Sequence, residues 1–267
     1  MNMKNSRIAI IGGGNLGAAI AEGLIKSEFV PADNITVTRR NVEALLPLKK
    51  LGANVTSDNK AAIANSDVII VALKPYNVVD ILQGLNGSFD PSRHIIISVV
   101  TGVLLKDLSA IVNHGVPIFR AMPNTAIAIR ESVTCLCHEG GTNEQVNYVT
   151  ELFQQLGVSI NIDEKLMDAA TVLGACGIAY ALRFIRASTQ GGIEIGFDAK
   201  TANLIAAQTV KGAAELLLKL NRHPEEEIDK VTTPKGCTIV GLNEMEHQGF
   251  SSSLIKGIGA SYEKIGK

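Results

Sequence analysis

The chain has no tryptophan, and aromatic residues make up only 4% of its 267 residues. Proteins that bind single-stranded nucleic acid stack the bases on aromatic side chains, and nucleic-acid-binding domains in general are strongly basic. Here 25 lysines and arginines face 26 aspartates and glutamates, so the formal net charge is −1. The composition therefore favours neither a nucleic-acid partner nor an anionic membrane surface.

Cysteine and histidine are too few and too scattered for two further classes. Four cysteines are too sparse for a disulfide-stabilised fold in a chain of this length. Cys135 and Cys137 alternate in an apolar stretch, where a strand would place both on one face, so we expect buried thiols rather than a metal pair. The five histidines lack i, i+4 pairing and Cys-x-x-Cys companions, and we expect no metal site.

Segments for export or membrane insertion are not evident either. A short polar start leads directly into an apolar run, so we expect no signal peptide. The most apolar later stretch, 166–182, contains Asp168 and falls short of a bilayer span. We therefore expect a soluble, cytoplasmic protein.

A glycine-rich turn near the amino terminus is the most informative segment that is present. The apolar run 8–11 leads into Gly12-Gly13-Gly14-Asn15-Leu16-Gly17, which has the G-x-G-x-x-G spacing of a dinucleotide-binding turn. Gly12 allows the tight turn, Gly14 lets the backbone approach a pyrophosphate, and Gly17 lets helix and strand pack closely. The free amides of the following helix favour phosphate. An ordinary glycine-rich turn is the alternative.

The end of the next expected strand bears on the choice of dinucleotide. Proteins that bind NAD usually carry a carboxylate about 20 residues beyond the glycines, for the ribose 2′-hydroxyl. Arg39 and Arg40 stand there instead, followed by Asn41, and the first acid is Glu43. Because guanidinium groups pair with phosphate in a fork geometry, we predict NADP rather than NAD. A solvated basic turn is the alternative.

The chain changes character after Asp163. Before it, short β-branched runs alternate with helical segments, which predicts an α/β, Rossmann-type domain over 1–162 with a parallel sheet and helices on both faces. After it, long helices rich in Ala and Leu dominate, with Asp198 as an N-cap. Such apolar helices need a partner, so we expect 163–267 to be an all-helical dimerisation domain; a self-contained helical cap is the alternative. The expected strands are 8–11, 35–38, 67–73, 94–99, 117–122, 132–137 and 158–162.

Three loops at expected strand ends mark a site. Ligands of open α/β sheets gather outside the carboxyl ends of the strands. Ala72-Leu73-Lys74-Pro75, Thr101-Gly102 and 120–125 follow three such strands. Each alone is compatible with ordinary loop chemistry, but three of them in one dinucleotide fold favour a binding site.

A second set of candidate residues lies in the helical half. Thr233-Pro234-Lys235-Gly236-Cys237-Thr238 forms a turn that opens a helix. Its free amides suit a carboxylate, and the hydroxyls of Thr233 and Thr238 can donate to a small polar ligand. The residues alone are equally compatible with a simple helix cap.

These motifs, in this order and over nearly the whole chain, resemble the pyrroline-5-carboxylate reductases. The resemblance implies that NADPH, preferred over NADH, delivers a hydride to C5 of 1-pyrroline-5-carboxylate to give L-proline, in a homodimer formed by the carboxyl-terminal helices. An assembly of several dimers is left open. By resemblance Thr238 is catalytic and hydrogen-bonds the ring nitrogen, within a substrate site of Thr233, Lys235, Gly236, Cys237 and Thr238. The cofactor site comprises Gly12, Gly13, Gly14, Asn15, Leu16, Arg39, Arg40, Asn41, Asn59, Ala72, Leu73, Lys74, Pro75, Thr101, Gly102, Met122, Pro123 and Asn124.

The chain departs from the family's pattern in two places. The family's Ser-Gly-Ser-Gly-Pro-Ala-Tyr is Gly174-Ala175-Cys176-Gly177-Ile178-Ala179-Tyr180 here, and Lys235 replaces a glycine. A side chain at 235 strains a turn that needs positive φ, or adds a cation for the substrate carboxylate. Two alternative functions follow, namely reduction of a related cyclic imine and a non-catalytic role as an NADP-binding sensor or scaffold.

Overall fold

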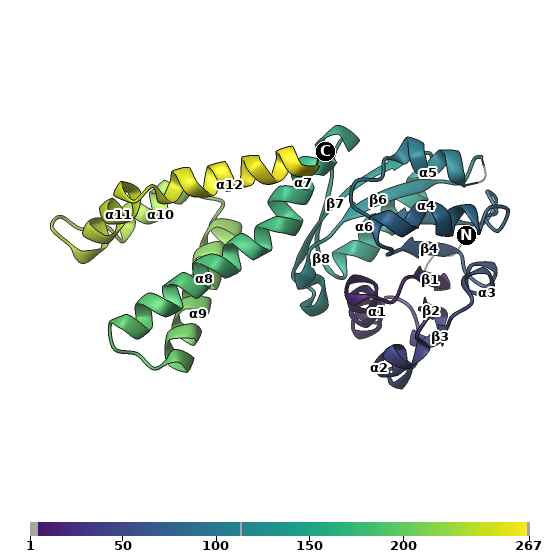
Figure 1. The fold of residues 1–267 in the computed structure, drawn as a ribbon, viewed down its shortest axis with the longest axis horizontal. Coiled ribbons are helices and arrows are strands. Elements are labelled where there is room, and N and C mark those ends of the chain that lie inside the picture. The colour runs from purple at the N-terminus through teal and green to yellow at the C-terminus, as the bar shows by residue number, and fades with distance from the viewer. Residues whose placement is uncertain (1–4, 113, 266–267) are drawn as a thin grey trace. The chain divides into compact units, whose positions relative to one another are not determined.

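The computed structural model describes residues 5–112 and 114–265, which fall into two compact units (Figure 1). The first unit reaches Cys176, and the second covers Gly177–Lys264. Residues 163–176, which the sequence pattern groups with the helical domain, pack with the first unit.

The first unit is built on one eight-stranded sheet with the strand order β3-β2-β1-β4-β5-β6-β7-β8. Neighbouring strands run parallel except β6 and β7, which pair antiparallel. The expectation of a wholly parallel sheet is therefore wrong at this one pair. A parallel return needs a crossover of a dozen or more residues, and here only the short 3₁₀ turn η4 (Thr125–Ile129) and Arg130 in a left-handed conformation reverse the chain. The strands are β1 (Ile8–Ile11), β2 (Ile35–Thr38), β3 (Asn54–Thr56), β4 (Val68–Val71), β5 (Ile95–Ser98), β6 (Ile118–Met122), β7 (Ser132–Glu139) and β8 (Gly157–Asn161).

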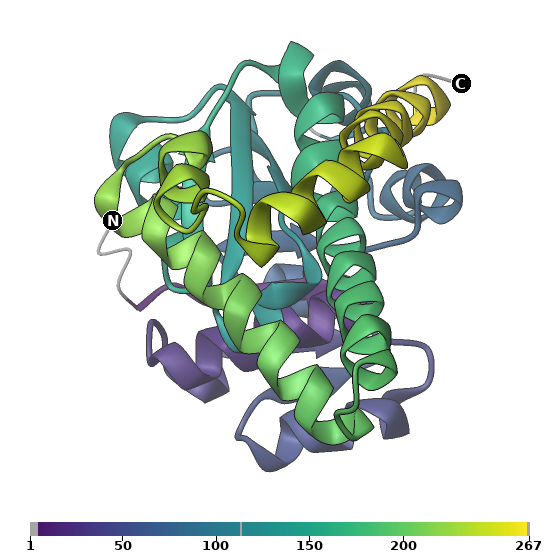
Figure 2. The same cartoon turned by 90° about the vertical axis from the view of Figure 1, so that its left-hand side faces the viewer.

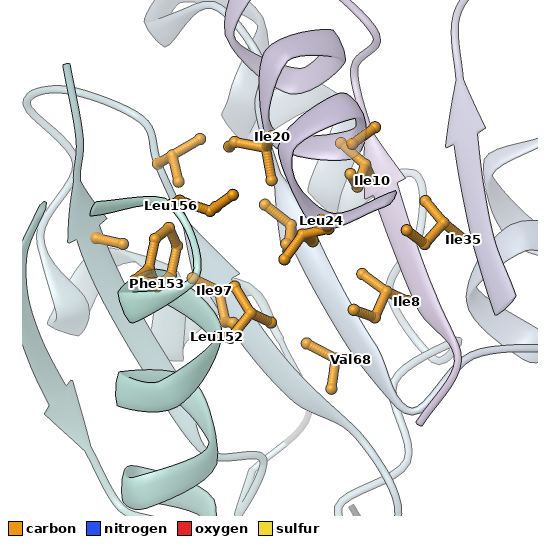
Figure 3. Packing of buried hydrophobic residues seen from close by; sticks show 14 of the residues in the cluster. Ile8, Ile10, Ile20, Leu24, Ile35, Val68, Ile97, Leu152, Phe153 and Leu156 are labelled. Atoms are coloured by element: carbon orange, nitrogen blue, oxygen red, sulfur yellow. The ribbon is translucent and has the colours of Figure 1, made fainter. Parts of the chain in front are cut away.

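Helices cover both faces of this sheet, as expected. Alternate residues of a strand point to opposite faces, so β1 divides its side chains between two cores. Ile8 and Ile10 pack with Ile20 and Leu24 of α1 and with Phe153 of α6 (Figure 3). Ala9 and Ile11 belong to the second core, which contains side chains of α3, α4 and α5. The helices are α1 (Asn15–Ser27), α2 (Leu46–Lys50), α3 (Asn59–Ala64), α4 (Pro75–Gln83), α5 (Leu105–Ile111) and α6 (Asn143–Gln154).

A helical run carries the chain out of the first unit. It begins with the 3₁₀ turn η5 (Glu164–Leu166) and α7 (Met167–Ala170), passes through a π-helical turn, η6 (Thr171–Cys176), and continues as α8 (Gly177–Glu194). Within this turn the carbonyl oxygen of Gly174 accepts a hydrogen bond from Asn124 Nδ2 at 3.3 Å. The side chain of Asn124 thus supports the turn from the end of β6.

The second unit is entirely helical over its described residues. Helices α8 and α9 (Ala199–Leu220) lie along one another (Figure 1, Figure 2), followed by α10 (Pro224–Lys230), α11 (Cys237–His247) and α12 (Phe250–Ile265). The predicted N-cap of α9 is confirmed, since the Asp198 carboxylate accepts from the amides of Lys200 and Thr201 at 3.0 and 3.1 Å. Large apolar side chains remain exposed on these helices, among them Leu182, Leu204 and Leu218 at 57%, 68% and 78%.

The apolar stretch judged too short for a membrane span belongs to a longer helical run. Glu164–Glu194 is long and apolar enough to cross a membrane by length and composition alone, and only 11% of its most apolar window is buried within the chain. The expectation from 166–182 is wrong in this respect, because the helix continues past Leu182.

Candidate functional site

The glycine turn between β1 and α1 has the backbone geometry that its spacing predicts. Gly12 has a φ of 109°, and a Cβ there would lie 2.4 Å from the carbonyl oxygen of Ala72. A Cβ on Gly17 would lie 2.1 Å from the carbonyl oxygen of Gly12. Both distances are far shorter than a non-bonded contact permits, so only glycine fits at these two positions.

Gly14 is different, because the space beside it is open. A Cβ built on Gly14 meets no described atom within 4 Å. Gly14 is also the N-cap of α1 and provides no side-chain hydrogen bond, so the first amides of the helix have no cap. An open backbone approach to uncapped helix amides is what a pyrophosphate requires, and the turn therefore fits a dinucleotide.

The end of β2 is joined to this turn by three hydrogen bonds. The amides of Gly12 and Gly13 donate to Thr38, to its hydroxyl at 3.3 Å and its carbonyl at 2.6 Å. Arg39 Nη1 donates to the carbonyl oxygen of Gly13 at 3.1 Å, so its guanidinium lies against the turn. Thr38 was not among the predicted site residues, and its position as the last residue of an expected strand was the only signal for it.

The two residues after Arg39 have distinct roles. The Arg40 side chain is exposed and has no hydrogen bond or ion pair with the described residues. Asn41 Oδ1 accepts from the amide of Glu43 at 3.1 Å and so caps the 3₁₀ turn η3 (Val42–Leu45). The arrangement leaves Arg40 as the guanidinium available to an external phosphate.

Parallel strands bring the other predicted cofactor residues to the same edge of the sheet. The sheet order β2-β1-β4-β5-β6 makes the loops that follow these five strands neighbours, and the chain order reverses at β1, where such folds bind ligands. Lys74 is exposed directly before α4, and the Thr101 hydroxyl lies 3.9 Å from Met122 Sδ. Asn59 begins α3 and is half-buried. Asn124 differs, since its side-chain amide is engaged with Ala126 and Gly174.

The second predicted site forms a tight turn at the start of α11. Gly236 donates its amide to the Thr233 carbonyl at 2.9 Å, and a Cβ on Gly236 would lie 2.4 Å from Thr233 Oγ1. Lys235 has a φ of 59°, the left-handed conformation that glycine adopts without cost. Gly236 is the N-cap of α11 without a side-chain hydrogen bond, so the helix amides that follow have no cap.

The threonines of this turn separate into two kinds. The Thr232 hydroxyl donates to the Ile228 carbonyl at 2.7 Å and is therefore occupied. The hydroxyls of Thr233 and Thr238 have no hydrogen-bond partner within the part of the chain that the structure describes. The hydroxyls of Thr233 and Thr238 are therefore available to hydrogen-bond an external polar group.

Of the two cysteines on β7, Cys137 is buried as expected, whereas Cys135 is only half-buried. Burial raises the pKa of Cys137 to about 11, and it also raises the pKa of Cys135. Both side chains therefore stay protonated near neutral pH. Over residues 5–112 and 114–265, no group of three or more His, Cys, Asp or Glu side chains is placed to hold a metal ion.

Two family models match the chain. One, described as pyrroline-5-carboxylate reductase dimerisation, covers residues 164–267, and the other, described as NADP oxidoreductase, coenzyme F420-dependent, covers residues 7–102. The first match contains the exposed helices, and the second contains the glycine turn, Arg40 and Lys74.

Curated proteins and solved structures of high similarity share one enzyme name. Pyrroline-5-carboxylate reductase 2 of Dictyostelium discoideum is 43% identical over 98% of this chain and 93% of that protein. Pyrroline-5-carboxylate reductase 1 of the same organism is 47% identical over 99% of this chain, and the chain spans about half (50%) of that protein's length. The crystal structure of Plasmodium falciparum pyrroline carboxylate reductase with NADP bound matches with a TM-score of 0.88, at 26% identity over 99% of this chain and 98% of that one.

Proposed function

Because this chain belongs to the pyrroline-5-carboxylate reductase family, we propose that it reduces 1-pyrroline-5-carboxylate to L-proline, with NADPH supplying a hydride to C5 of the cyclic imine. The observation that carries this proposal is the presence of two turns with suitable binding geometry in one chain. One is the open backbone at Gly14, and the other is the turn before α11, where two threonine hydroxyls have no partner among the described residues.

The cofactor site is proposed at the carboxyl edge of the sheet. The uncapped amides that begin α1 would hold the pyrophosphate, and Arg40, with Arg39 and Asn41 beside it, would hold the 2′-phosphate. Lys74 would add a positive charge on the other side of β1. The remaining members of the proposed site are Gly12, Gly13, Asn15, Leu16, Asn59, Ala72, Leu73, Pro75, Thr101, Gly102, Met122, Pro123 and Asn124.

The substrate site is proposed at the turn before α11. The amides of Cys237 and Thr238 would bind the substrate carboxylate, with the ammonium group of Lys235 nearby in sequence. The Thr238 hydroxyl would hydrogen-bond the ring nitrogen and orient the imine. An iminium carbon is already electrophilic, so holding and orienting the ring is the main task of the protein and no strong general base is needed.

The chain forms a dimer through its family's dimerisation region, and we propose that the copies are identical and meet through the second-unit helices. The match over 164–267 and the exposed apolar side chains of α8 and α9 support this proposal. We propose a cytoplasmic enzyme, in which the partner's helices cover the apolar face of Glu164–Glu194.

The decisive experiment follows NADPH absorbance in purified protein after 1-pyrroline-5-carboxylate is added, with NADH in parallel and proline measured as product. Saturable NADPH oxidation with one proline formed per NADPH is the expected result. Tight NADPH binding without proline formation would contradict the proposed substrate, and related cyclic imines would then be assayed. Activity with those imines alone would assign the departures at Lys235 and Cys176 to substrate choice.

A further inference from the structure

A fully buried arginine lies on β6, two residues before the end of the strand that carries Met122 of the proposed cofactor site. Arg120 occupies the middle of β6, and its side chain is only 1% exposed. Its Nη1 donates to Glu164 Oε1 at 2.8 Å, while Nε and Nη2 have no hydrogen-bond partner among the described residues. A buried guanidinium is costly without a counter-charge, so Glu164 is required wherever Arg120 is kept.

The same carboxylate oxygen also holds the start of a helix. Glu164 Oε1 accepts from the amide of Leu105, the first residue of α5, at 2.7 Å. Leu105 follows the loop Thr101-Gly102 after only two intervening residues, and a negative charge at a helix N-terminus is favourable. Glu164 therefore fixes the start of α5, the helix that follows the loop Thr101-Gly102.

Arg120 is connected to the other side of the same loop through strand β6. Arg120 lies two residues before Met122, the last residue of β6, whose sulfur lies 3.9 Å from the Thr101 hydroxyl. Glu164 acts on the loop through α5, and Arg120 acts on it through β6. One ion pair thus holds both walls of the loop after β5.

We propose that Arg120 and Glu164 are positioning residues for NADPH, an inference that rests on the proposed function of this edge. They hold Thr101-Gly102 and Met122 in the geometry that the cofactor binds, without touching it themselves. Glu164 is also the first residue matched by the dimerisation model, so the first residue of the dimerisation region also supports the cofactor loop.

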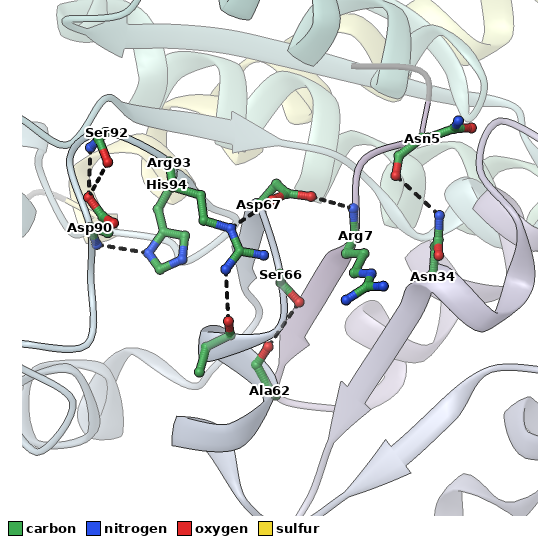
Figure 4. Close-up of polar contacts among 11 residues, drawn as sticks. Asn5, Arg7, Asn34, Ala62, Ser66, Asp67, Asp90, Ser92, Arg93 and His94 are labelled. Atoms are coloured by element: carbon green, nitrogen blue, oxygen red, sulfur yellow. Dashed lines mark hydrogen bonds and ion pairs between the residues drawn. The ribbon is translucent and has the colours of Figure 1, made fainter. Parts of the chain in front are cut away.

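The chain contains a control pair made of the same chemical groups, in which the arginine is 35% rather than 1% exposed. Arg93 Nε lies 2.8 Å from Asp67 Oδ1, and Asp67 Oδ2 accepts from the amide of Arg7 at 2.8 Å (Figure 4). A guanidinium, a carboxylate and a backbone amide are again combined, but before strands β1, β4 and β5 rather than after them. If ion pairs of this kind only support the fold, mutation of either pair should lower Tm and leave the Kd of NADPH unchanged.

The test compares Arg120→Met and Glu164→Gln with Arg93→Met and Asp67→Asn. Each variant is measured for Tm, for the Kd of NADPH by calorimetry without substrate, and for kcat and KM. A displacement of about 1 Å can cost up to roughly 100-fold in function, and we expect the first two variants to raise the Kd of NADPH on the order of tenfold. Their KM for 1-pyrroline-5-carboxylate should change much less. The control variants should lower Tm and leave the Kd of NADPH unchanged.

A double variant separates positioning from fold support. Arg120→Met with Glu164→Met removes both charges, and replacing a buried pair by apolar groups commonly restores stability. We expect Tm to recover while the Kd of NADPH stays raised, because the Leu105 amide has lost its acceptor. Recovery of both quantities, or an equal rise in Kd for Arg93→Met, would refute the positioning role.

The outcome also distinguishes this proposal from the proposed function. If wild-type protein binds NADPH but makes no proline, the Kd comparison still decides the role of the pair. If wild-type protein binds no NADPH, both proposals fail. If Arg120→Met does not fold, the double variant Arg120→Met with Glu164→Met carries the test, since it leaves no buried charge unpaired and removes the acceptor of the Leu105 amide.

Discussion

Polar groups lie at both ends of the parallel strands, but they are used differently at the amino-terminal ends and at the carboxyl-terminal ends. At the amino-terminal ends of the strands several polar groups pair with one another. Asp67 binds Arg93 and the amide of Arg7, and His94 Nδ1 accepts from the amide of Asp90 at 2.9 Å, although the buried His94 Nε2 has no partner among the described residues (Figure 4). At the carboxyl edge Gly14 faces open space and Arg40 has no partner among the described residues. Closed polar networks stabilise a fold, whereas polar groups left open at one edge indicate where a ligand binds.

The largest expected effect contrasts two glycines of one turn. Gly17→Ala should lower the free energy of unfolding by about 3 kcal/mol, because the new methyl group would overlap the Gly12 carbonyl oxygen. Gly14→Ala should leave stability nearly unchanged and weaken NADPH binding, since its methyl group enters only the open space. Chemical denaturation and NADPH titration measure the two effects. If Gly14→Ala binds NADPH as wild type does, the open side of the turn is not the cofactor site.

The second-largest effect is expected at Thr238, whose hydroxyl has no partner among the described residues. Thr238→Ala should lower kcat on the order of 100-fold, as loss of one catalytic hydrogen bond does, with the Kd of NADPH nearly unchanged. Thr232→Ala is the matched control, because its hydroxyl is bound to the Ile228 carbonyl. Steady-state kinetics and NADPH titration give both quantities. Equal kcat values for the two variants would remove Thr238 from its assigned role.

The basic turn after β2 tests the choice of dinucleotide. Arg40→Ala should weaken NADPH binding about tenfold or more, the effect of one charge-assisted hydrogen bond, and should leave NADH binding almost unchanged. Lys50→Ala, which removes an exposed cation of α2, serves as the control. The Kd values of both cofactors are compared by calorimetry. Equal losses for NADPH and NADH would overturn the assignment of Arg40 to the 2′-phosphate.

A smaller effect is expected at the strained lysine of the substrate turn. Lys235→Gly should raise the free energy of unfolding by about 1 kcal/mol, because glycine adopts positive φ without penalty. Its KM for 1-pyrroline-5-carboxylate should rise through loss of the cation. Glu28→Gly relieves a φ of 57° elsewhere and should add stability without changing KM. A Lys235→Gly variant with unchanged KM would make the lysine neutral for substrate binding.

The smallest effect concerns the pH dependence of stability, through His94 at the amino-terminal end of β5. Burial and then the nearby Arg93 lower the pKa of His94 from 6.5, although Asp90 and Asp67 act in the opposite direction. The unfolded chain therefore takes up the proton first, and stability falls as pH drops through 6.5 toward the lower folded pKa. Denaturation measured between neutral and mildly acidic pH should show this loss in wild type and a flatter dependence in His94→Gln. An unchanged slope in the variant would exclude His94 as the source.

Sequence patterns predicted those features whose causes are local. Strands β1 and β2 have the expected bounds, because apolar or β-branched runs end at a glycine turn and at two arginines. Strand β3 and helix α3 were missed, since three and six residues leave too short a pattern. The direction of β7 was also missed, because alternation of apolar residues carries no information on strand direction.

The candidate site shows the same division. The glycine spacing and the basic turn lie within about 30 residues of one another, the length of one βαβ unit, so a local sequence pattern identifies them. The partners of Glu164 stand 44 and 59 positions away, at Arg120 and Leu105, so no local pattern identifies it. Thr38 was missed for a similar reason, since its contact with Gly12 spans 26 positions.

The π-helical turn Thr171–Cys176 has a consequence for how related chains can differ in length. Such a turn holds one residue more than a regular helical turn, and that residue sets the phase of every later side chain on the run. Each residue of an α-helix rotates the chain by about 100°, so loss of a single codon here would restore regular winding and turn all of α8 by that angle. Helix α9 packs against α8 itself, so these two helices would keep their own contacts. An insertion or deletion within these six positions therefore changes the phase of the run, whereas a substitution leaves that phase unchanged.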